Sequence, residues 1–224
     1  MTTQSQSAAT SRAADWRRKL RWVLRWFPSQ ADRWIHQWFV SRHGLQKADR
    51  IFTHVTPREK RVLFSAARRR GGTIVEIGSY LGASASFLAA GLRQSHHAGR
   101  VYCVDTWQND AMSEGRRDTW AEFQRNVADF LDVIVPIRAD SVEAAASFET
   151  AVDLLFVDGD HSYEGCRRDV AAWLPKLRAD GWIFMHDAGW AEGVLRVIEE
   201  LVVPHMARHK MVCPNLWWGC RRAE

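Results

Sequence analysis

The sequence has few cysteines, and no two of them form a Cys-x-x-Cys pair. The spacing gives no sign of a disulfide framework, and each cysteine lies inside a segment with the pattern of a strand or a helix. Reduced thiols of the cytoplasm explain this usage best. The four residues are Cys103, Cys166, Cys213 and Cys220.

Long apolar runs are also absent, which excludes a membrane-spanning helix. The N-terminus opens on polar residues and reaches arginines only later, without the apolar core or cleavage site of a signal peptide. No internal repeat is found. A composition of 46% hydrophobic and 25% charged residues is ordinary for a globular chain. We therefore expect a cytoplasmic protein with one main domain and a prefix.

The dinucleotide fingerprint Gly-x-Gly-x-x-Gly is missing as well, but a related turn is present. An apolar strand ends at Gly78, a second glycine follows at Gly82, and a helix starts near Ala83. Glycines let the backbone approach a ligand, and the start of a helix offers free N–H groups to an anion. With Glu76 inside the strand, the segment predicts a site for a small nucleoside that carries a carboxylate. The alternative is an ordinary strand-to-helix turn.

Acidic residues follow the next two predicted strands. The second strand ends on Asp105, close to the distance along the chain at which a carboxylate meets ribose hydroxyls. The third strand, residues 133–138, runs into Asp140, which could accept a hydrogen bond from an adenine amino group. Helix capping is an equally good explanation of Asp140.

Residues 70 to 220 resemble the class I S-adenosylmethionine-dependent methyltransferases, on the strength of Glu76-x-Gly78-x-x-x-Gly82, Asp105 and Asp140. The resemblance implies that the glycine turn lies under the methionine part of the cofactor. It also implies that Asp105 takes the ribose and that Asp140 lies near the adenine. Ser84 matches a helix-start position that can hold the methionine carboxylate.

Ionisable residues gather after the fourth and fifth predicted strands, residues 152–157 and 181–185. They are Asp158, Asp160, His161, His186 and Asp187. The carboxyl ends of neighbouring parallel strands share one edge of a sheet, where open α/β sheets bind ligands. Carboxylates arriving from two strands suit a hard cation such as magnesium.

This segment resembles a narrower group, the macrocin O-methyltransferase and cephalosporin-biosynthesis type. The resemblance implies that Asp158 and Asp187 bind the metal, with His186 beside them, and that Asp160 removes the proton of the acceptor hydroxyl. His186 stands where that group has a carboxylate, and histidine suits manganese or zinc better than magnesium. His161 is the alternative base, because imidazole titrates near neutral pH. A neutral histidine bonded to a loop carbonyl is the structural alternative for both histidines.

These assignments predict a direct displacement in which S-adenosylmethionine gives its methyl group to a hydroxyl oxygen. A divalent metal, magnesium or manganese, would hold two neighbouring acceptor oxygens, which favours small-molecule or sugar-type acceptors over amines. A nucleic-acid methyltransferase is disfavoured because the loops carry no Asn/Asp-Pro-Pro-Tyr/Phe segment for a flipped base. A non-catalytic binding module of the same fold is the third reading.

The N-terminal third differs in charge from the rest. Residues 1–70 hold 16 Lys or Arg against 4 Asp or Glu, whereas residues 71–224 hold 15 against 22. We expect a disordered tail over residues 1–11, a helical prefix or lid over residues 12–70 and a methyltransferase domain over residues 71–224. The asymmetry points to an anionic surface or partner for the prefix.

Within the prefix, residues 14–27 form an amphipathic pattern with tryptophans on one face and arginines opposite. This is typical of a helix at a membrane surface, and it also suits a lid or a homo-oligomer interface, which we prefer. Ser29 and Asp32 predict a second helix bearing Trp34, Ile35, Trp38 and Phe39. A third helix opens at Thr56 and stops at the glycine pair of residues 71–72.

The fold class predicted is a doubly wound α/β sandwich with a seven-stranded, mostly parallel sheet. Helices over residues 162–177 and 191–203 would cover the sheet, with Tyr163, Val170, Trp173 and Leu174 of the first facing inward. Segments 209–213 and 216–220 would form a closing hairpin. The antiparallel last strand is implied only by the family resemblance.

Overall fold

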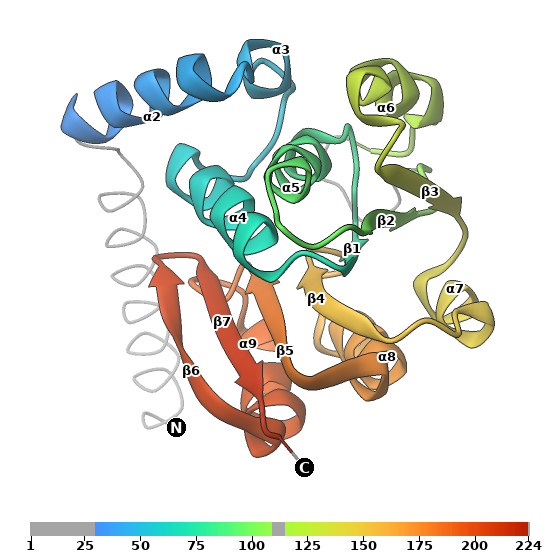
Figure 1. Ribbon diagram of the computed structural model, residues 1–224. Coiled ribbons are helices and arrows are strands. Elements are labelled where there is room, and N and C mark those ends of the chain that lie inside the picture. The colour runs from blue at the N-terminus through green and yellow to red at the C-terminus, as the bar shows by residue number, and fades with distance from the viewer. Residues whose placement is uncertain (1–29, 109–114, 224) are drawn as a thin grey trace, which may run out of the picture.

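The protein is described by a computed structural model that covers residues 30–108 and 115–223 (Figure 1). Its centre is one sheet of seven strands in the order β3-β2-β1-β4-β5-β7-β6. Strands β1 to β5 run parallel, and β7 is antiparallel to both β5 and β6. The strands are β1 (Thr73–Ile77), β2 (Arg100–Asp105), β3 (Ile134–Arg138), β4 (Val152–Val157), β5 (Leu177–His186), β6 (Met206–Cys213) and β7 (Leu216–Arg221). The predicted doubly wound sheet with its closing hairpin is confirmed.

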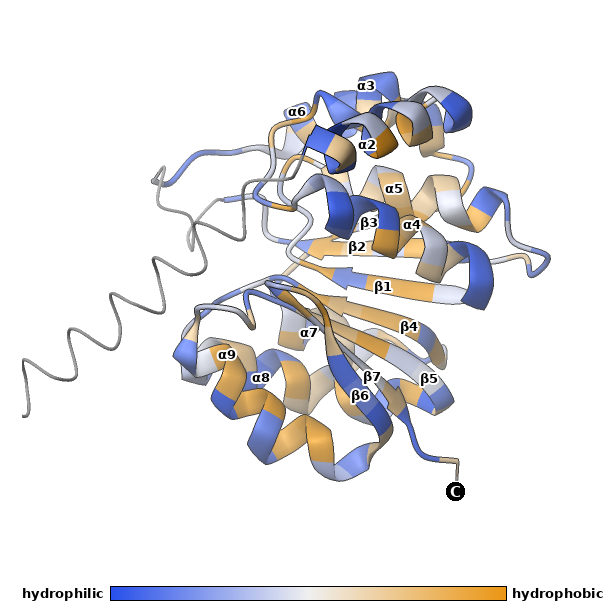
Figure 2. Cartoon of the chain, turned by 90° about the vertical axis from the view of Figure 1, so that its left-hand side faces the viewer, coloured by the Kyte–Doolittle hydropathy of each residue, from blue (hydrophilic) through white to orange (hydrophobic). Residues whose placement is uncertain are grey.

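Helices cover both faces of this sheet, with α2 to α6 on one side and α7 to α9 on the other (Figure 2). The helices are α2 (Gln30–His43), α3 (Gln46–Asp49), α4 (Pro57–Arg70), α5 (Ala83–Arg93), α6 (Trp120–Asn126), α7 (Ser141–Ser147), α8 (Tyr163–Trp173) and α9 (Glu192–Val197). Short 3₁₀ turns lie at Ala128–Phe130, Leu174–Lys176 and Val203–His205, and a π-helical turn lies at Ile198–Val202. Each face therefore has its own apolar core, as a doubly wound fold requires.

Helix α4 begins and ends where the sequence predicts. Thr56 Oγ1 accepts a hydrogen bond from Glu59 N, and Glu59 Oε2 accepts one from Thr56 N at 2.8 Å, which completes a capping box. Pro57 occupies the first turn, where its missing N–H costs nothing. Gly71 follows the helix with a φ of 60°, a conformation that glycine adopts readily.

Helix α2 buries a different set of side chains from the set named in the sequence prediction. Phe39 packs edge-on against Phe64 of α4, but Trp34 and Trp38 are 71% and 63% exposed. The buried positions of α2 are His36 and Val40. The predicted cap Ser29, the amphipathic segment 14–27 and the tail 1–11 lie outside the described residues.

Two predicted helices are shorter than the sequence pattern suggests. The helix expected over residues 162–177 ends at Trp173, and a 3₁₀ turn containing Pro175 leads into β5. Proline interrupts a helix because it lacks the N–H and its ring clashes with the preceding turn. The helix expected over residues 191–203 changes to π and 3₁₀ turns after Val197. Within residues 30–108 and 115–223, no helix has both the length and the apolar character needed to cross a bilayer.

Candidate active site at the carboxyl ends of β1, β2, β4 and β5

The turn after β1 lies directly against the end of β4. Gly78 has a φ of 83°, and a Cβ added there would come within 2.1 Å of the Asp158 carbonyl oxygen. Asp158 N also donates to Ile77 O at 2.9 Å. Only glycine combines this conformation with such a close approach. Gly78 therefore joins the predicted cofactor turn to the predicted metal residues.

Glu76, inside β1, is fully buried next to this turn. Its Oε2 accepts a hydrogen bond from Ser79 Oγ at 2.6 Å, and its Oε1 has no hydrogen-bond partner among the described residues. Burial raises the pKa of Glu76 to about 7, hydrogen bonds from Ser79 and Ser84 oppose the rise, and the charge of Asp158 adds to it. A buried acceptor without a partner is costly, so Oε1 has the chemistry to receive a donor from a ligand.

Asp105, at the end of β2, is held by backbone groups. Its Oδ2 accepts from Tyr80 N at 2.8 Å and its Oδ1 accepts from Trp107 N at 2.7 Å. Burial raises the pKa of Asp105, and these N–H donors oppose the rise. Tyr80 and Trp107 both have positive φ angles, of 44° and 54°. Such strain in non-glycine residues is typical of functional turns, and the carboxylate keeps lone pairs for further donors.

Two other predicted cofactor residues have structural partners of their own. Gly82 has a φ of 88°, and an added Cβ would meet Val127 Cγ1 at 2.5 Å, so protein packing requires glycine there. Ser84 is buried in the first turn of α5, near enough to Glu76 to lower the pKa of that carboxyl. Contact of either residue with a cofactor remains a prediction.

Asp140 caps helix α7. Its Oδ1 accepts from Val142 N at 2.8 Å, and its Oδ2 lies 3.3 Å from Arg168 Nη2. The capping explanation considered for this residue is therefore realised in the structure. Binding of an adenine amino group remains a prediction.

Asp158, His161 and Asp187 form the candidate metal group. One ligand atom from each lies within 4.8 Å of the others, and His161 Nε2 is 2.6 Å from Asp187 Oδ2. Burial alone would lower the pKa of His161, but its hydrogen bond with Asp187 and the charges of Asp187 and Asp158 give a net rise. Two carboxylates and an imidazole are donors that suit manganese, and they also suit a proton held between His161 and Asp187.

Asp187 is positioned by two residues that the sequence did not identify as site groups. Its Oδ1 accepts from Trp190 Nε1 at 2.6 Å and from Asn215 Nδ2 at 2.7 Å. Asn215 lies in the turn between β6 and β7, and Trp190 lies just before α9. Asp187 itself has a φ of 58°. These contacts fix the carboxylate that faces His161.

His186 lies behind this group rather than in it. Its Nδ1 is 2.9 Å from Asp158 Oδ1, and its Nε2 is 3.4 Å from Glu59 Oε2 of α4. Burial would lower the pKa of His186, but the charge and hydrogen bond of Asp158 and the bonds with Asp187 and Glu59 raise it well above its ordinary value. Carboxylates face both ring nitrogens of His186, and a protonated ring would have no lone pair for a metal, so this geometry favours a supporting position over a ligand position.

Glu59 is the site residue that sequence reasoning missed. Its side chain is fully buried. Burial would raise its pKa, but its contact with His186 brings a net decrease. The sequence pattern explains Glu59 only as part of the capping box at the start of α4. Nothing in the local pattern indicates that it also reaches β5.

Asp160 is placed away from the candidate metal group. It is exposed, and its Oδ1 accepts from Ser162 N at 2.8 Å at the start of α8. A Cβ added at Gly165 would meet Asp160 Oδ2 at 2.2 Å, so the carboxylate folds over the first turn of this helix. The structure thus brings His161, but not Asp160, to Asp158 and Asp187.

Comparison with known proteins agrees with this geometry. A family model described as a methyltransferase domain matches residues 75–188. The O-methyltransferase NovP superposes with a TM-score of 0.62 at 15% identity, over 76% of this chain and 82% of its own. PaMTH1 of Podospora anserina, bound to SAH, superposes with a TM-score of 0.59 at 16% identity, over 100% of this chain and 98% of its own. The SAH complex of an O-methyltransferase from Bacillus cereus superposes with a TM-score of 0.56 at 16% identity, over 88% of this chain and 93% of its own. At these identities the likeness concerns the fold.

One curated relative is matched over part of its length. The uncharacterized protein y4gI of Sinorhizobium fredii is 28% identical over 116 residues, which are 51% of this chain and 13% of that protein. The matched segment thus corresponds to a small part of the relative.

Proposed function

The chain belongs to the methyltransferase-domain family, and we propose that this S-adenosylmethionine-dependent enzyme methylates a hydroxyl oxygen of a small-molecule or sugar-type acceptor. The observation that supports this choice is the contact between Gly78 and Asp158, which sets the candidate metal and base group directly beside the cofactor turn. An acceptor held at Asp158 would then lie next to the methyl group to be transferred.

His161 is the residue best placed to remove the acceptor proton. Its bond to Asp187 fixes the ring, and Trp190 and Asn215 fix Asp187 in turn. A carboxylate that orients an imidazole also stabilises the imidazolium formed when the ring takes a proton. His161 is about one third exposed, so an acceptor can reach it, whereas His186 is enclosed.

A divalent metal also fits Asp158, His161 and Asp187, and in that arrangement His161 would be a ligand instead of the base. When bound, it would supply Lewis-acid activation of a hydroxyl and a fixed orientation for two neighbouring acceptor oxygens. The imidazole donor favours manganese over magnesium. We place His186 in a supporting role, because its two nitrogens face Asp158 and Glu59.

Calorimetric titration separates the cofactor residues from the metal residues. We expect S-adenosylmethionine and its demethylated product to bind the wild type and Asp158→Asn about equally well. Asp105→Asn should bind them at least about tenfold more weakly, because two ribose donors lose a charged acceptor. Manganese should bind the wild type and Asp105→Asn, but not Asp158→Asn.

Asp160→Asn is the matched control, since it neutralises a neighbouring carboxylate that bonds to Ser162 N ahead of α8 and lies outside the candidate metal group. It should keep both affinities. Manganese binding lost in Asp160→Asn but kept in Asp158→Asn would reverse the proposed roles. Absence of cofactor binding by the wild type would remove the basis of the proposed function.

A further inference from the structure

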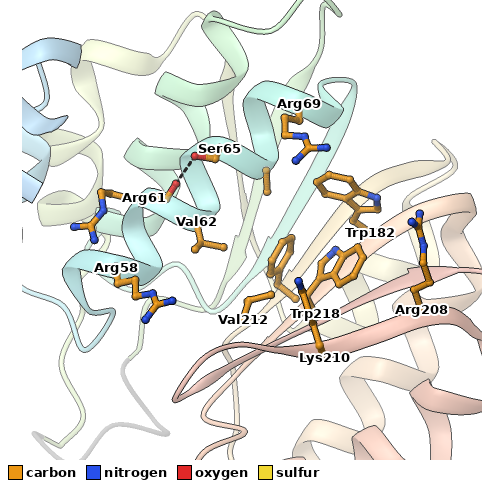
Figure 3. A pocket seen from close by; sticks show the side chains of 12 residues that line it. Arg58, Arg61, Val62, Ser65, Arg69, Trp182, Arg208, Lys210, Val212 and Trp218 are labelled. Atoms are coloured by element: carbon orange, nitrogen blue, oxygen red, sulfur yellow. Dashed lines mark hydrogen bonds between the residues drawn. The ribbon is translucent and has the colours of Figure 1, made fainter. Parts of the chain in front are cut away.

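A groove of about 490 Å³ lies between helix α4 and the strands β5, β7 and β6 (Figure 3). Its walls include Trp182 and Trp218, whose rings meet edge to face with centroids 5.8 Å apart, and Phe184 and Val62. None of the residues that line the groove belongs to the candidate active-site group. This volume is in the range of pockets that hold small ligands.

Cationic side chains surround this apolar floor from both sides. Figure 3 shows three of them on α4 and two on β6: Arg58, Arg61, Arg69, Arg208 and Lys210. Among the described residues that line the groove, none is acidic. Such a concentration of one charge over low-dielectric walls attracts anions.

Few of these cations are neutralised by the residues that the structure describes. Arg61 pairs with Asp32 at 3.0 Å, and the Arg69 guanidinium lies 5.6 Å from the Trp182 ring centroid. Arg58, Arg208 and Lys210 form no ion pair within residues 30–108 and 115–223. One guanidinium group can donate two hydrogen bonds to the oxygens of a phosphate, and an indole ring can stack on another flat ring.

The charge of residues 1–29 does not complement that of this groove. Residues 1–29 contain six Lys or Arg and one Asp, so their charge has the same sign as that of the groove. The charge complementarity instead favours a separate anionic ligand. The presence of tryptophans beside the arginines favours one whose anionic group is attached to a flat ring.

We propose that this groove binds a small organic phosphate of the nucleoside diphosphate type, with the phosphates against Arg208 and Lys210 and the ring against Trp218. This site is separate from the catalytic one, so the inference goes beyond the proposed methyl transfer. A ligand with both parts should bind more tightly than either part alone.

The test is calorimetry on the full chain with saturating S-adenosylhomocysteine and no divalent metal, so that the cofactor site and the metal group are not available to the probe. The probes are uridine diphosphate, inorganic pyrophosphate and uridine. We expect uridine diphosphate to bind at least about tenfold more tightly than pyrophosphate, and uridine more weakly still, because charge and stacking act together. Rising salt should weaken binding of both phosphates.

The variant Arg208→Glu with Lys210→Glu should weaken uridine diphosphate binding about tenfold or more, while leaving S-adenosylhomocysteine affinity and Tm unchanged, because both side chains are exposed on β6. Arg125→Glu, an exposed change on α6 outside the groove, is the matched control and should bind as the wild type does. Equal binding by the double variant, absence of binding by the wild type, or displacement of uridine diphosphate by S-adenosylhomocysteine would overturn the proposal. A single-stranded oligonucleotide that binds far more tightly than uridine diphosphate would overturn it in favour of a nucleic-acid surface.

Discussion

The two sides of the strand-end edge are built from different chemical groups. On the β1–β2 side, Asp105 is held by the backbone N–H groups of Tyr80 and Trp107. On the β4–β5 side, Asp158 and Asp187 are held mainly by other side chains. The first side depends on backbone groups of the turns after β1 and β2, and the second depends on side chains from segments far apart in the chain, such as Glu59 and His186.

The side-chain network on the second side continues through α4. Glu59 points toward His186. Its neighbour Lys60 donates a hydrogen bond to Asp49 at 2.8 Å, and Asp49 also bonds to His36. One helix therefore connects the candidate active-site edge to the α2–α3 layer through buried and half-buried ionisable side chains. Buried charges stabilise a fold only while each has its partner.

The largest effect should come from His186→Ala, which removes the imidazole between Glu59 and Asp158. Breaking a buried ion pair by deleting one partner costs about 3–5 kcal/mol of unfolding free energy. Urea denaturation of the two single variants, His186→Ala and Glu59→Gln, and of the double variant measures the coupling between the two residues. The double variant should lose less than the sum of the single losses, and strictly additive losses would show that the two residues do not interact.

Gly78→Ala tests the contact that joins the two sides. The new Cβ would collide with the Asp158 carbonyl in a backbone conformation that alanine disfavours, which should cost about 3 kcal/mol and weaken cofactor binding. Gly44→Ala is the matched control, since Gly44 also has a positive φ, of 68°, but has open space around it. A loss at Gly78 no greater than the loss at Gly44 would show that the contact has no energetic importance.

Glu76→Gln should stabilise the cofactor-free protein at high pH. Because the pKa of Glu76 in the folded protein is raised to about 7, the folded state keeps a proton that the unfolded chain releases. The contribution of protonated Glu76 to the free energy of unfolding is therefore present at low pH. It is lost as pH rises from the ordinary glutamate range to about 7. Denaturation at pH 5 and 8 should show a gain for the variant that is about 2–3 kcal/mol larger at pH 8 than at pH 5. An equal gain at both values would contradict the assignment.

Asp49→Asn, a change in the side-chain network of α4, should alter the pH dependence of stability in the opposite sense. Burial would raise the pKa of Asp49, but His36 and Lys60 lower it to about 2. The carboxylate therefore stabilises the fold above about pH 4, and this contribution is lost as pH falls toward 2. The variant should be less stable by about 1–2 kcal/mol at pH 7 and equal to the wild type near pH 2, as measured by thermal denaturation. A constant difference would attribute the loss to packing.

The strands and their end residues could be predicted because their signals are local. The apolar run before Gly78 and the strand ending on Asp105 fall where the sequence places them. Positions whose role depends on a distant element were harder. His186 was expected to bind metal, but Glu59, 127 residues away in the chain, faces its second nitrogen. Asp160 was expected to act as base, but its carboxylate accepts a hydrogen bond from the backbone of Ser162, the residue that caps α8.

By itself, the sequence determined the order of strands and helices, the glycine turn and the acidic residues at the strand ends, because periodicity and turn chemistry act over a few residues. Only the tertiary structure decided which of these acids have partners. It joined α4 to β5 through Glu59, and β7 to Asp187 through Asn215. The physical reason is that burial and charge pairing depend on distances between segments, and a one-dimensional pattern does not contain those distances.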